Sequence, residues 1–121
     1  MTPACQTVLV VEDDPTLLEF TAELLADDGL DVIRAGSSDQ AMAIMESGRI
    51  PSILVTDVGL AGGPSGLDLA ATVADRWPEV RLLIVSGQCR PAQGDYPERA
   101  VFFTKPYAHG ALLSMIRSPD W

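Results

Sequence analysis

The stretch VLVVEDDP, residues 8–15, places four apolar residues directly before three adjacent carboxylates and a proline. The apolar residues belong to a β-rich run, Thr7–Val11, which predicts a buried strand. Asp14 followed by proline is typical of a helix start, with Asp14 as the N-cap and the proline as the first helical residue. Capping accounts for Asp14, so Glu12 and Asp13 require another explanation.

Strands and helices are expected to alternate along the rest of the chain. The further predicted strands are short and mostly apolar: Asp31–Ala35, Ile53–Thr56, Arg81–Val85 and Val101–Phe103. The predicted helices run from Pro15 to Gly29, from Ser37 to Gly48, from Ser65 to Trp77 and over Ala111–Ile116. This alternation predicts an α/β, flavodoxin-like three-layer fold: a five-stranded parallel sheet with helices on both faces.

Local patterns support two of these helices. The helix after Pro15 should bury one apolar stripe, because its members recur at steps of three and four residues. The members of this stripe are Leu17, Leu18, Thr21, Leu24 and Leu25. Ser37 and Gln40 match a capping box, with the serine at the N-cap and the glutamine at the third helical position.

Polar residues stand where four of the five predicted strands end. In chain order they are Glu12 and Asp13, Asp57, Ser86 and Lys105. The strand Asp31–Ala35 has no reactive residue at its end. Ligand sites of open α/β sheets lie at the carboxyl ends of the strands, near the switch in strand order. The pattern therefore predicts the order 2-1-3-4-5, which leaves Asp31–Ala35 at the edge.

The carboxylates of Glu12, Asp13 and Asp57 are expected to converge at the carboxyl ends of the central strands. Two like charges about 4 Å apart repel by roughly 4 kcal/mol at an effective dielectric of about 20, so positive charge must compensate. Lys105 supplies one charge, and a Mg²⁺ ion, which binds carboxylates, water and phosphate oxygens, supplies two more. With the Ser86 hydroxyl, this set predicts phosphoryl transfer with Asp57 as the acceptor.

Composition narrows the class of protein. The chain has 121 residues, 47% hydrophobic and 21% charged, which predicts one domain over residues 1–121. Its net charge of −9 disfavours direct binding to nucleic acid. Apolar runs reach only four or five residues and no signal-peptide pattern opens the chain, so a cytoplasmic protein that does not enter a membrane is expected.

Four segments spread over the chain together resemble a response-regulator receiver domain of two-component signalling, which has the chemotaxis-regulator-like fold. They are VVEDD (10–14), VTDVGL (55–60), LLIVSG (82–87) and FFTKPY (102–107). The resemblance implies a phosphoacceptor switch, fed by a histidine kinase or a His-containing phosphotransfer protein and read by a downstream protein. Such a switch is not an enzyme, except that it catalyses its own phosphorylation and dephosphorylation.

The resemblance also implies a role for each matching residue. Asp57 would be phosphorylated and would help to bind Mg²⁺. Asp13 would ligate Mg²⁺ directly, Glu12 through water, and Gly59 through its backbone carbonyl. Ser86 and Phe102 would form the switch pair, in which the hydroxyl moves to the phosphoryl group and the aromatic ring rotates. Lys105 would pair with a phosphoryl oxygen, and the Lys105–Pro106 bond would be cis.

The chain departs from the family pattern in three places. The loop after Asp57 carries about one extra residue, with Ala61 where proline is frequent in the family. Gly87–Ala100 contains two prolines and two glycines, so the fourth helix of the family is expected to be short or degenerate. The sequence stops after the last predicted helix, and its start at Met1 favours a free-standing chain or an N-terminal domain.

Two other functions are compatible with parts of the pattern. A Mg²⁺-dependent phosphohydrolase on a similar sheet would need a second acid near Asp57, commonly two residues later, where Gly59 stands. A degenerate receiver would act only as a protein-interaction module. The acceptor, acidic, hydroxyl and lysine positions are all filled, which favours the phosphoacceptor switch over both.

Overall fold

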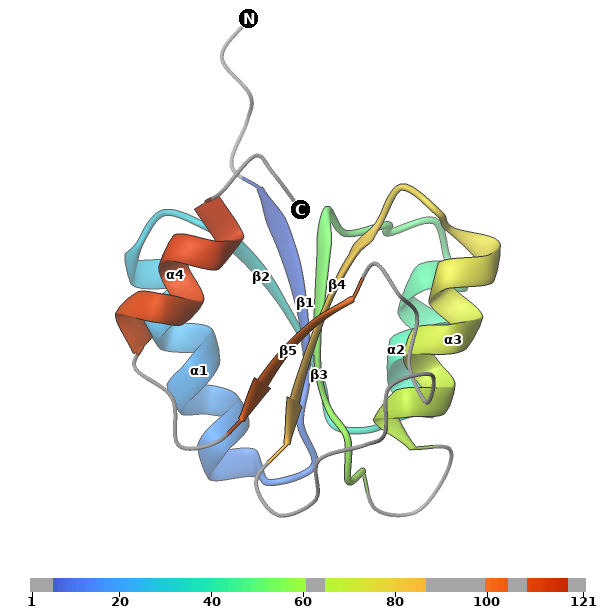
Figure 1. Ribbon diagram of the computed structural model, residues 1–121, viewed down its shortest axis with the longest axis horizontal. Coiled ribbons are helices and arrows are strands. Elements are labelled where there is room, and N and C mark those ends of the chain that lie inside the picture. The colour runs from blue at the N-terminus through green and yellow to red at the C-terminus, as the bar shows by residue number, and fades with distance from the viewer. Residues whose placement is uncertain (1–5, 61–64, 87–99, 105–108, 118–121) are drawn as a thin grey trace, which may run out of the picture.

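The computed structural model describes residues 6–60, 65–86, 100–104 and 109–117. Within these residues, strands and helices alternate (Figure 1). The strands are β1 (Thr7–Val11), β2 (Asp31–Ala35), β3 (Ile53–Asp57), β4 (Arg81–Ser86) and β5 (Val101–Thr104). The helices are α1 (Pro15–Asp27), α2 (Ser38–Glu46), α3 (Gly66–Arg76) and α4 (His109–Arg117).

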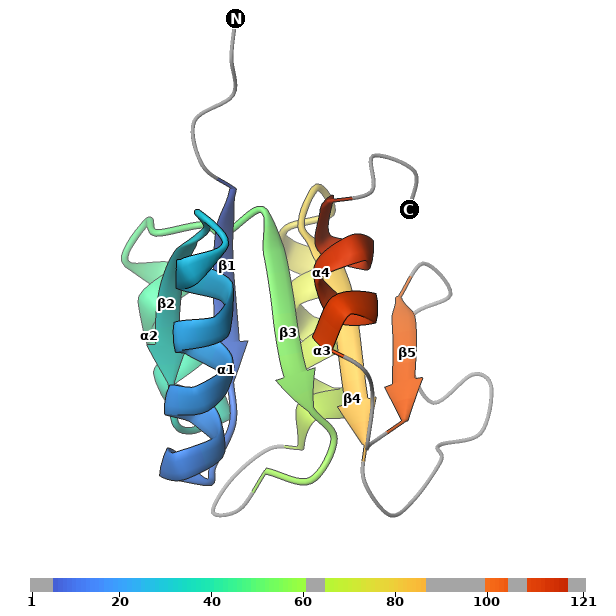
Figure 2. The same cartoon turned by 90° about the vertical axis from the view of Figure 1, so that its left-hand side faces the viewer.

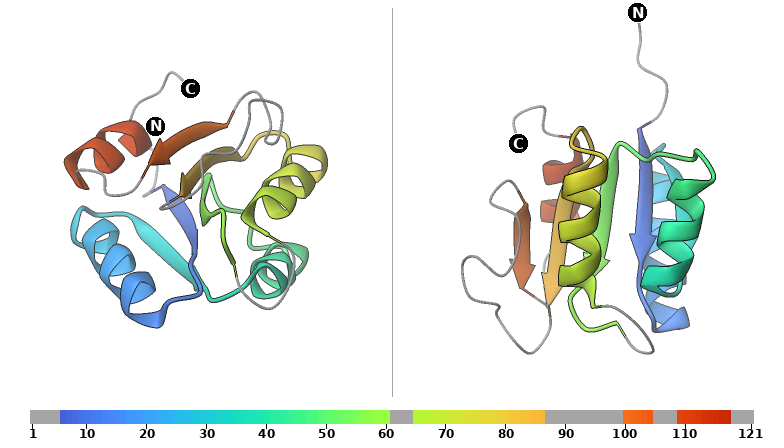
Figure 3. Two further views of the ribbon diagram at one scale, coloured as in Figure 1. Left: turned by 60° about the horizontal axis from the view of Figure 1, so that its bottom comes forward. Right: turned by 90° about the vertical axis from the view of Figure 1, so that its right-hand side faces the viewer.

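The strands form one parallel sheet in the order β2-β1-β3-β4-β5, which confirms the predicted order. Figure 2 shows that the strands run in the same direction, so their carboxyl ends share one edge of the sheet. At these carboxyl ends β1 and β3 are neighbours, whereas β2 is the outermost strand on one side of the sheet (Figure 3). The switch in strand order therefore falls between β1 and β3, as the polar residues predicted.

Helices cover both faces of the sheet and bury a separate apolar cluster on each. In Figure 1, α1 and α4 lie on one face, and α2 and α3 lie on the other. Alternate side chains of each central strand enter the two clusters, so Leu54 packs toward α2 and α3 while Val55 packs toward α1 and α4. Burial on both faces explains why the central strands are continuous apolar runs rather than alternating ones.

The first helix begins and ends as its sequence predicts. Asp14 Oδ1 accepts from the backbone N–H groups of Thr16, at 2.9 Å, and Leu17, at 3.3 Å, which confirms Asp14 as the N-cap. At the other end the N–H of Gly29 donates to Ala26 and the N–H of the next residue donates to Leu25, the paired bonds of a Schellman motif. Gly29 has a φ of 91°, a backbone conformation that glycine tolerates best.

We expect Gly29→Ala to lower the free energy of unfolding by roughly 1 kcal/mol, because a Cβ is disfavoured in the left-handed conformation. Apart from Gly29 and its two chain neighbours, no described atom lies within 4 Å of the position that this Cβ would take, so the loss reports backbone strain. Gly110→Ala is the control, since a Cβ there also meets nothing within 4 Å and φ is not positive. Urea denaturation measures both changes, and equal effects would contradict the assignment.

Two local predictions need correction. Leu17 is 44% exposed, because the face of α1 that packs on the sheet is centred on Ala22 and Leu25. Ser37 caps α2 by accepting from the N–H of Gln40, but Gln40 Oε1 accepts from the N–H of Gly36, one residue before the N-cap, at 2.7 Å.

Element boundaries differ slightly from the prediction. Asp57 and Ser86 are the last residues of β3 and β4 rather than the residues that follow them, because each is still paired with the neighbouring strand. Helix α4 is longer than predicted at both ends. The expected short or degenerate helix in Gly87–Ala100 and the cis bond at Lys105–Pro106 lie outside the described residues, apart from Ala100.

No helix among the described residues combines the length and the apolar character that crossing a bilayer requires.

Candidate functional site

The candidate site lies at the carboxyl ends of β1, β3 and β4. Chain geometry brings these ends together, because Val11 pairs in register with Thr56, and Asp57 pairs with Val85. The residue after β1 is Glu12, and the last residue of β3 is Asp57. The side chains at these positions therefore meet around the point where the strand order reverses, which is where open α/β sheets bind ligands.

Glu12 is only 9% exposed, which is unusual for a carboxylate. Its backbone N–H donates to the carbonyl of Ala35 at 3.1 Å, which anchors the turn after β1 to the end of β2. Its Oε2 accepts from the N–H of Asp14 at 3.2 Å. The turn thus holds Glu12 against the sheet, while Asp13 beside it is exposed.

Asp57 is partly buried, and its carboxylate is held by its own loop. Oδ1 accepts from the backbone N–H of Gly59 at 3.1 Å. The main chain on either side is also bonded: the N–H of Val58 donates to the carbonyl of Val85 at 2.9 Å, and the Thr56 hydroxyl donates to the carbonyl of Asp57 at 3.0 Å. The orientation of the carboxylate therefore follows from the backbone of this short segment.

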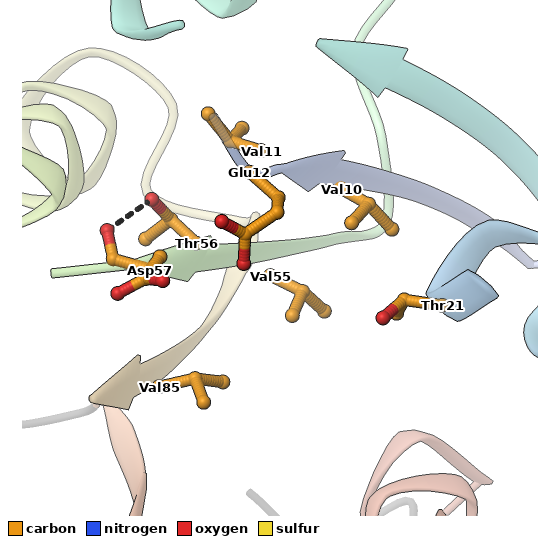
Figure 4. A pocket seen from close by; sticks show the side chains of 8 residues that line it. All are labelled: Val10, Val11, Glu12, Thr21, Val55, Thr56, Asp57 and Val85. Atoms are coloured by element: carbon orange, nitrogen blue, oxygen red, sulfur yellow. Dashed lines mark hydrogen bonds between the residues drawn. The ribbon is translucent and has the colours of Figure 1, made fainter. Parts of the chain in front are cut away.

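Glu12 and Asp57 line the same pocket. Figure 4 shows both carboxyl groups beside it, together with the side chain of Thr21 from α1. Among the described residues, the lining consists of Val10, Val11, Glu12, Thr21, Val55, Thr56, Asp57 and Val85. Apolar walls around two carboxylates make a site in which their negative charge is poorly screened, so the pocket favours a positively charged occupant.

The predicted cluster of three carboxylates is not formed as a ready-made set of ligands. Among the described residues, no three acidic, histidine or cysteine side chains lie close enough together to hold a metal ion. Two acids, Glu12 and Asp57, share the pocket, whereas Asp13 does not line it. Carboxylates at close range repel one another, which opposes the approach of a third negative charge before a cation binds.

The donor set nevertheless fits Mg²⁺. This ion takes oxygen ligands, uses one or two carboxylates, and keeps several waters or shares phosphate oxygens. Glu12, Asp57 and the adjacent Asp13 offer carboxylate oxygen, and Gly59 offers a backbone carbonyl. A set of this kind does not need three carboxylates in contact before the ion arrives.

The remaining predicted residues fall on β4 and β5 or beyond them. Ser86 is 4% exposed at the end of β4. Phe102, on β5, is half-buried and packs against the apolar cluster beneath α2 and α3. It pairs in register with Ile84, two residues before Ser86. Lys105 lies outside the described residues.

Two residues at the site were not singled out from the sequence. Thr56 carries a buried hydroxyl after three apolar residues of β3, and this change from apolar to polar was the only sign of it in the sequence. Gly66 begins α3 and packs against the main chain of Asp57, at the end of a glycine-rich loop that offered several glycines without distinguishing one.

The fold and the site together define a doubly wound α/β domain with an acidic pocket at the ends of its two central strands. The chain belongs to the response regulator receiver domain family, whose model matches residues 8–117. It is thus a receiver domain of two-component signalling, as the resemblance in four of its segments indicated.

Curated relatives agree with this membership and are longer proteins. The chain is 28% identical over 112 residues to the phyllosphere-induced regulator PhyR of Methylorubrum extorquens, with 90% of this chain and 41% of the relative covered. It is 33% identical over 85 residues to the transcriptional regulatory protein AruR of Pseudomonas aeruginosa, with 67% and 34% covered. The chain therefore spans less than half the length of these relatives.

Solved structures share the fold over nearly the whole chain. A response regulator receiver protein from Pseudomonas putida has a TM-score of 0.83 and 26% identity, with 95% of this chain and 98% of that chain covered. A putative response regulator from Chloroflexus aurantiacus has a TM-score of 0.81 and 26% identity, with 93% and 95% covered.

Proposed function

We propose that this receiver domain is a phosphoacceptor switch that accepts a phosphoryl group on Asp57 in the presence of Mg²⁺. The observation that carries the proposal is the shared pocket of Glu12 and Asp57 at the switch in strand order. The Asp57 carboxylate, at the end of β3, accepts a hydrogen bond from its own loop. The Glu12 carboxylate is buried in the same pocket, and a bound cation would compensate the two negative charges.

In the proposed reaction, a carboxylate oxygen of Asp57 attacks the phosphorus of a phosphohistidine. The bond between that oxygen and phosphorus forms as the N–P bond breaks, and the imidazole leaves with the electron pair and takes up a proton. The Gly59 N–H keeps the attacking carboxylate oriented, and the Ser86 hydroxyl can donate to the incoming phosphoryl oxygens. Lys105 would pair with another of these oxygens.

Asp13, Glu12, Asp57 and the Gly59 carbonyl would hold the metal ion. When bound, Mg²⁺ would neutralise the acidic edge and the phosphoryl oxygens that approach it. The chain would catalyse no reaction on a separate substrate, only its own phosphorylation and dephosphorylation. The phosphoryl donor would be a histidine kinase or a His-containing phosphotransfer protein, and a downstream protein would read the modified state. Ser86 and Phe102 would transmit it.

The direct test is to incubate the protein with acetyl phosphate and Mg²⁺ and to measure its intact mass. We expect a gain of one phosphoryl group per chain, because an acyl phosphate is small enough to replace the protein donor at the partly buried carboxylate of Asp57. Replacing Mg²⁺ by a chelator should suppress the gain. A protein that gains no phosphoryl group from acetyl phosphate or from any phosphohistidine donor would contradict the proposal.

A further inference from the structure

The main chain at Asp57 is contacted by Thr56 and by the start of α3. The Thr56 hydroxyl, in a residue only 1% exposed, donates to the Asp57 carbonyl at 3.0 Å. The N–H of Gly66 donates to the carbonyl of Val58 at 2.9 Å, so the first residue of α3 is bonded to the residue after Asp57. The N–H of Val58 also donates to the carbonyl of Val85, so hydrogen bonds restrain the main chain of both Asp57 and Val58.

Gly66 leaves no room for a side chain. A Cβ built on it would overlap the Asp57 carbonyl oxygen, and it would stand 2.7 Å from the Asp57 carbonyl carbon and 2.9 Å from Thr56 Oγ1. The overlap is with main chain rather than with the end of a flexible side chain, so it cannot be relieved by a rotamer change. Either the start of α3 or the backbone of Asp57 must move.

The burial of the Thr56 hydroxyl explains why it bonds to the Asp57 carbonyl. Thr56 occupies the face of β3 that packs toward α3, where the preceding residue of that face, Leu54, is fully buried and apolar. A hydroxyl in such surroundings must find an acceptor, and the Asp57 carbonyl is the one that it uses. The bond therefore ties the buried interior of the domain to the backbone of the residue that carries the acceptor carboxylate.

We propose that Thr56 and Gly66 are positioning residues, which aim the Asp57 carboxylate by holding its main-chain carbonyl. Only two rotatable bonds separate the Asp57 carboxylate from the backbone, so a shift of the backbone also shifts the carboxylate. The hydrogen bond from the Gly59 N–H then selects the rotamer. This inference rests on the proposed function, since it deepens the role of Asp57 as phosphoacceptor. It predicts that the rate of phosphorylation depends on two residues that act through the main chain of Asp57.

The experiment measures the rate of phosphorylation by acetyl phosphate at saturating Mg²⁺ in five proteins: wild type, Thr56→Val, Thr56→Ser, Gly66→Ala and Gly110→Ala. Thr56→Val keeps the shape and removes the hydroxyl, and we expect a rate loss of roughly fivefold, the effect of one neutral hydrogen bond. Thr56→Ser retains the hydroxyl and should restore most of the rate. Gly66→Ala should lose at least about tenfold, because misplacing reacting atoms by about an ångström costs up to about 100-fold.

Gly110→Ala is the matched control for Gly66→Ala, since it places the same methyl group in the first turn of another helix with nothing within 4 Å. Its rate should stay that of the wild type. The backbone amide shift of Gly59 in ¹⁵N–¹H spectra provides the second measurement, because it reports the bond to Asp57 Oδ1 directly. It should move in Thr56→Val and Gly66→Ala, and return toward the wild-type position in Thr56→Ser.

The outcomes separate this inference from the proposed function. A wild-type protein that gains no phosphoryl group overturns the function itself. A wild-type protein that is phosphorylated, with Thr56→Val equal to it in rate and in the Gly59 shift, overturns the positioning role and leaves the function standing. If Gly66→Ala does not fold, the comparison of the valine and serine variants at Thr56 decides alone.

Discussion

Asp57→Asn is expected to abolish phosphorylation of the protein by acetyl phosphate. The amide that replaces the carboxylate is nearly the same size and keeps an oxygen that can accept from the Gly59 N–H, so the loop should retain its shape. The amide oxygen is a much poorer nucleophile, because it carries no full negative charge, and the acyl phosphate cannot form. The change therefore removes the chemistry with little effect on the fold.

The measurement combines intact mass with the stability of the label. An acyl phosphate on Asp57 should be lost in base and should also be cleaved by neutral hydroxylamine, which leaves a phosphoserine or phosphothreonine intact. Asp39→Asn is the control, because Asp39 is an exposed acid in the first turn of α2. It should be phosphorylated like the wild type. An Asp57→Asn protein phosphorylated at the wild-type rate would exclude Asp57 as the acceptor.

The second large effect concerns the two adjacent aspartates after β1. Asp13→Ala should weaken Mg²⁺ binding by at least roughly tenfold, the smallest loss usually caused by removing even an outer-shell partner of a metal. Asp14→Ala should leave Mg²⁺ affinity nearly unchanged, because Asp14 is occupied as the N-cap of α1. Its expected cost is about 1 kcal/mol of folding free energy.

Calorimetric titration with Mg²⁺ measures the affinities, and urea denaturation without metal measures the stabilities. The two variants differ by one position and remove the same group, so each is the other's control. Loss of metal affinity in both variants, or in Asp14→Ala alone, would show that the ligand is misassigned. The contrast tests the role of Asp13 directly, since Asp13 is exposed and does not line the pocket.

The order of the strands was predictable because chemistry and topology constrain each other in a parallel sheet. Polar residues at the ends of four strands, and none at the end of Asp31–Ala35, are compatible with an order that places that strand outside. Helix ends were predictable for a similarly local reason. Asp14 and Gly29 act through hydrogen bonds to residues two to five positions away, which are already set by the sequence.

Only the tertiary structure decided how the acidic residues are arranged and what holds them. Adjacent carboxylates in a sequence carry no information on which one turns inward, and Glu12 is buried while Asp13 is exposed because the turn is anchored to β2. The roles of Thr56 and Gly66 were likewise hidden, since each depends on how closely α3 approaches the end of β3. The packing of several elements against one another sets such distances, so the sequence around a single residue does not predict them.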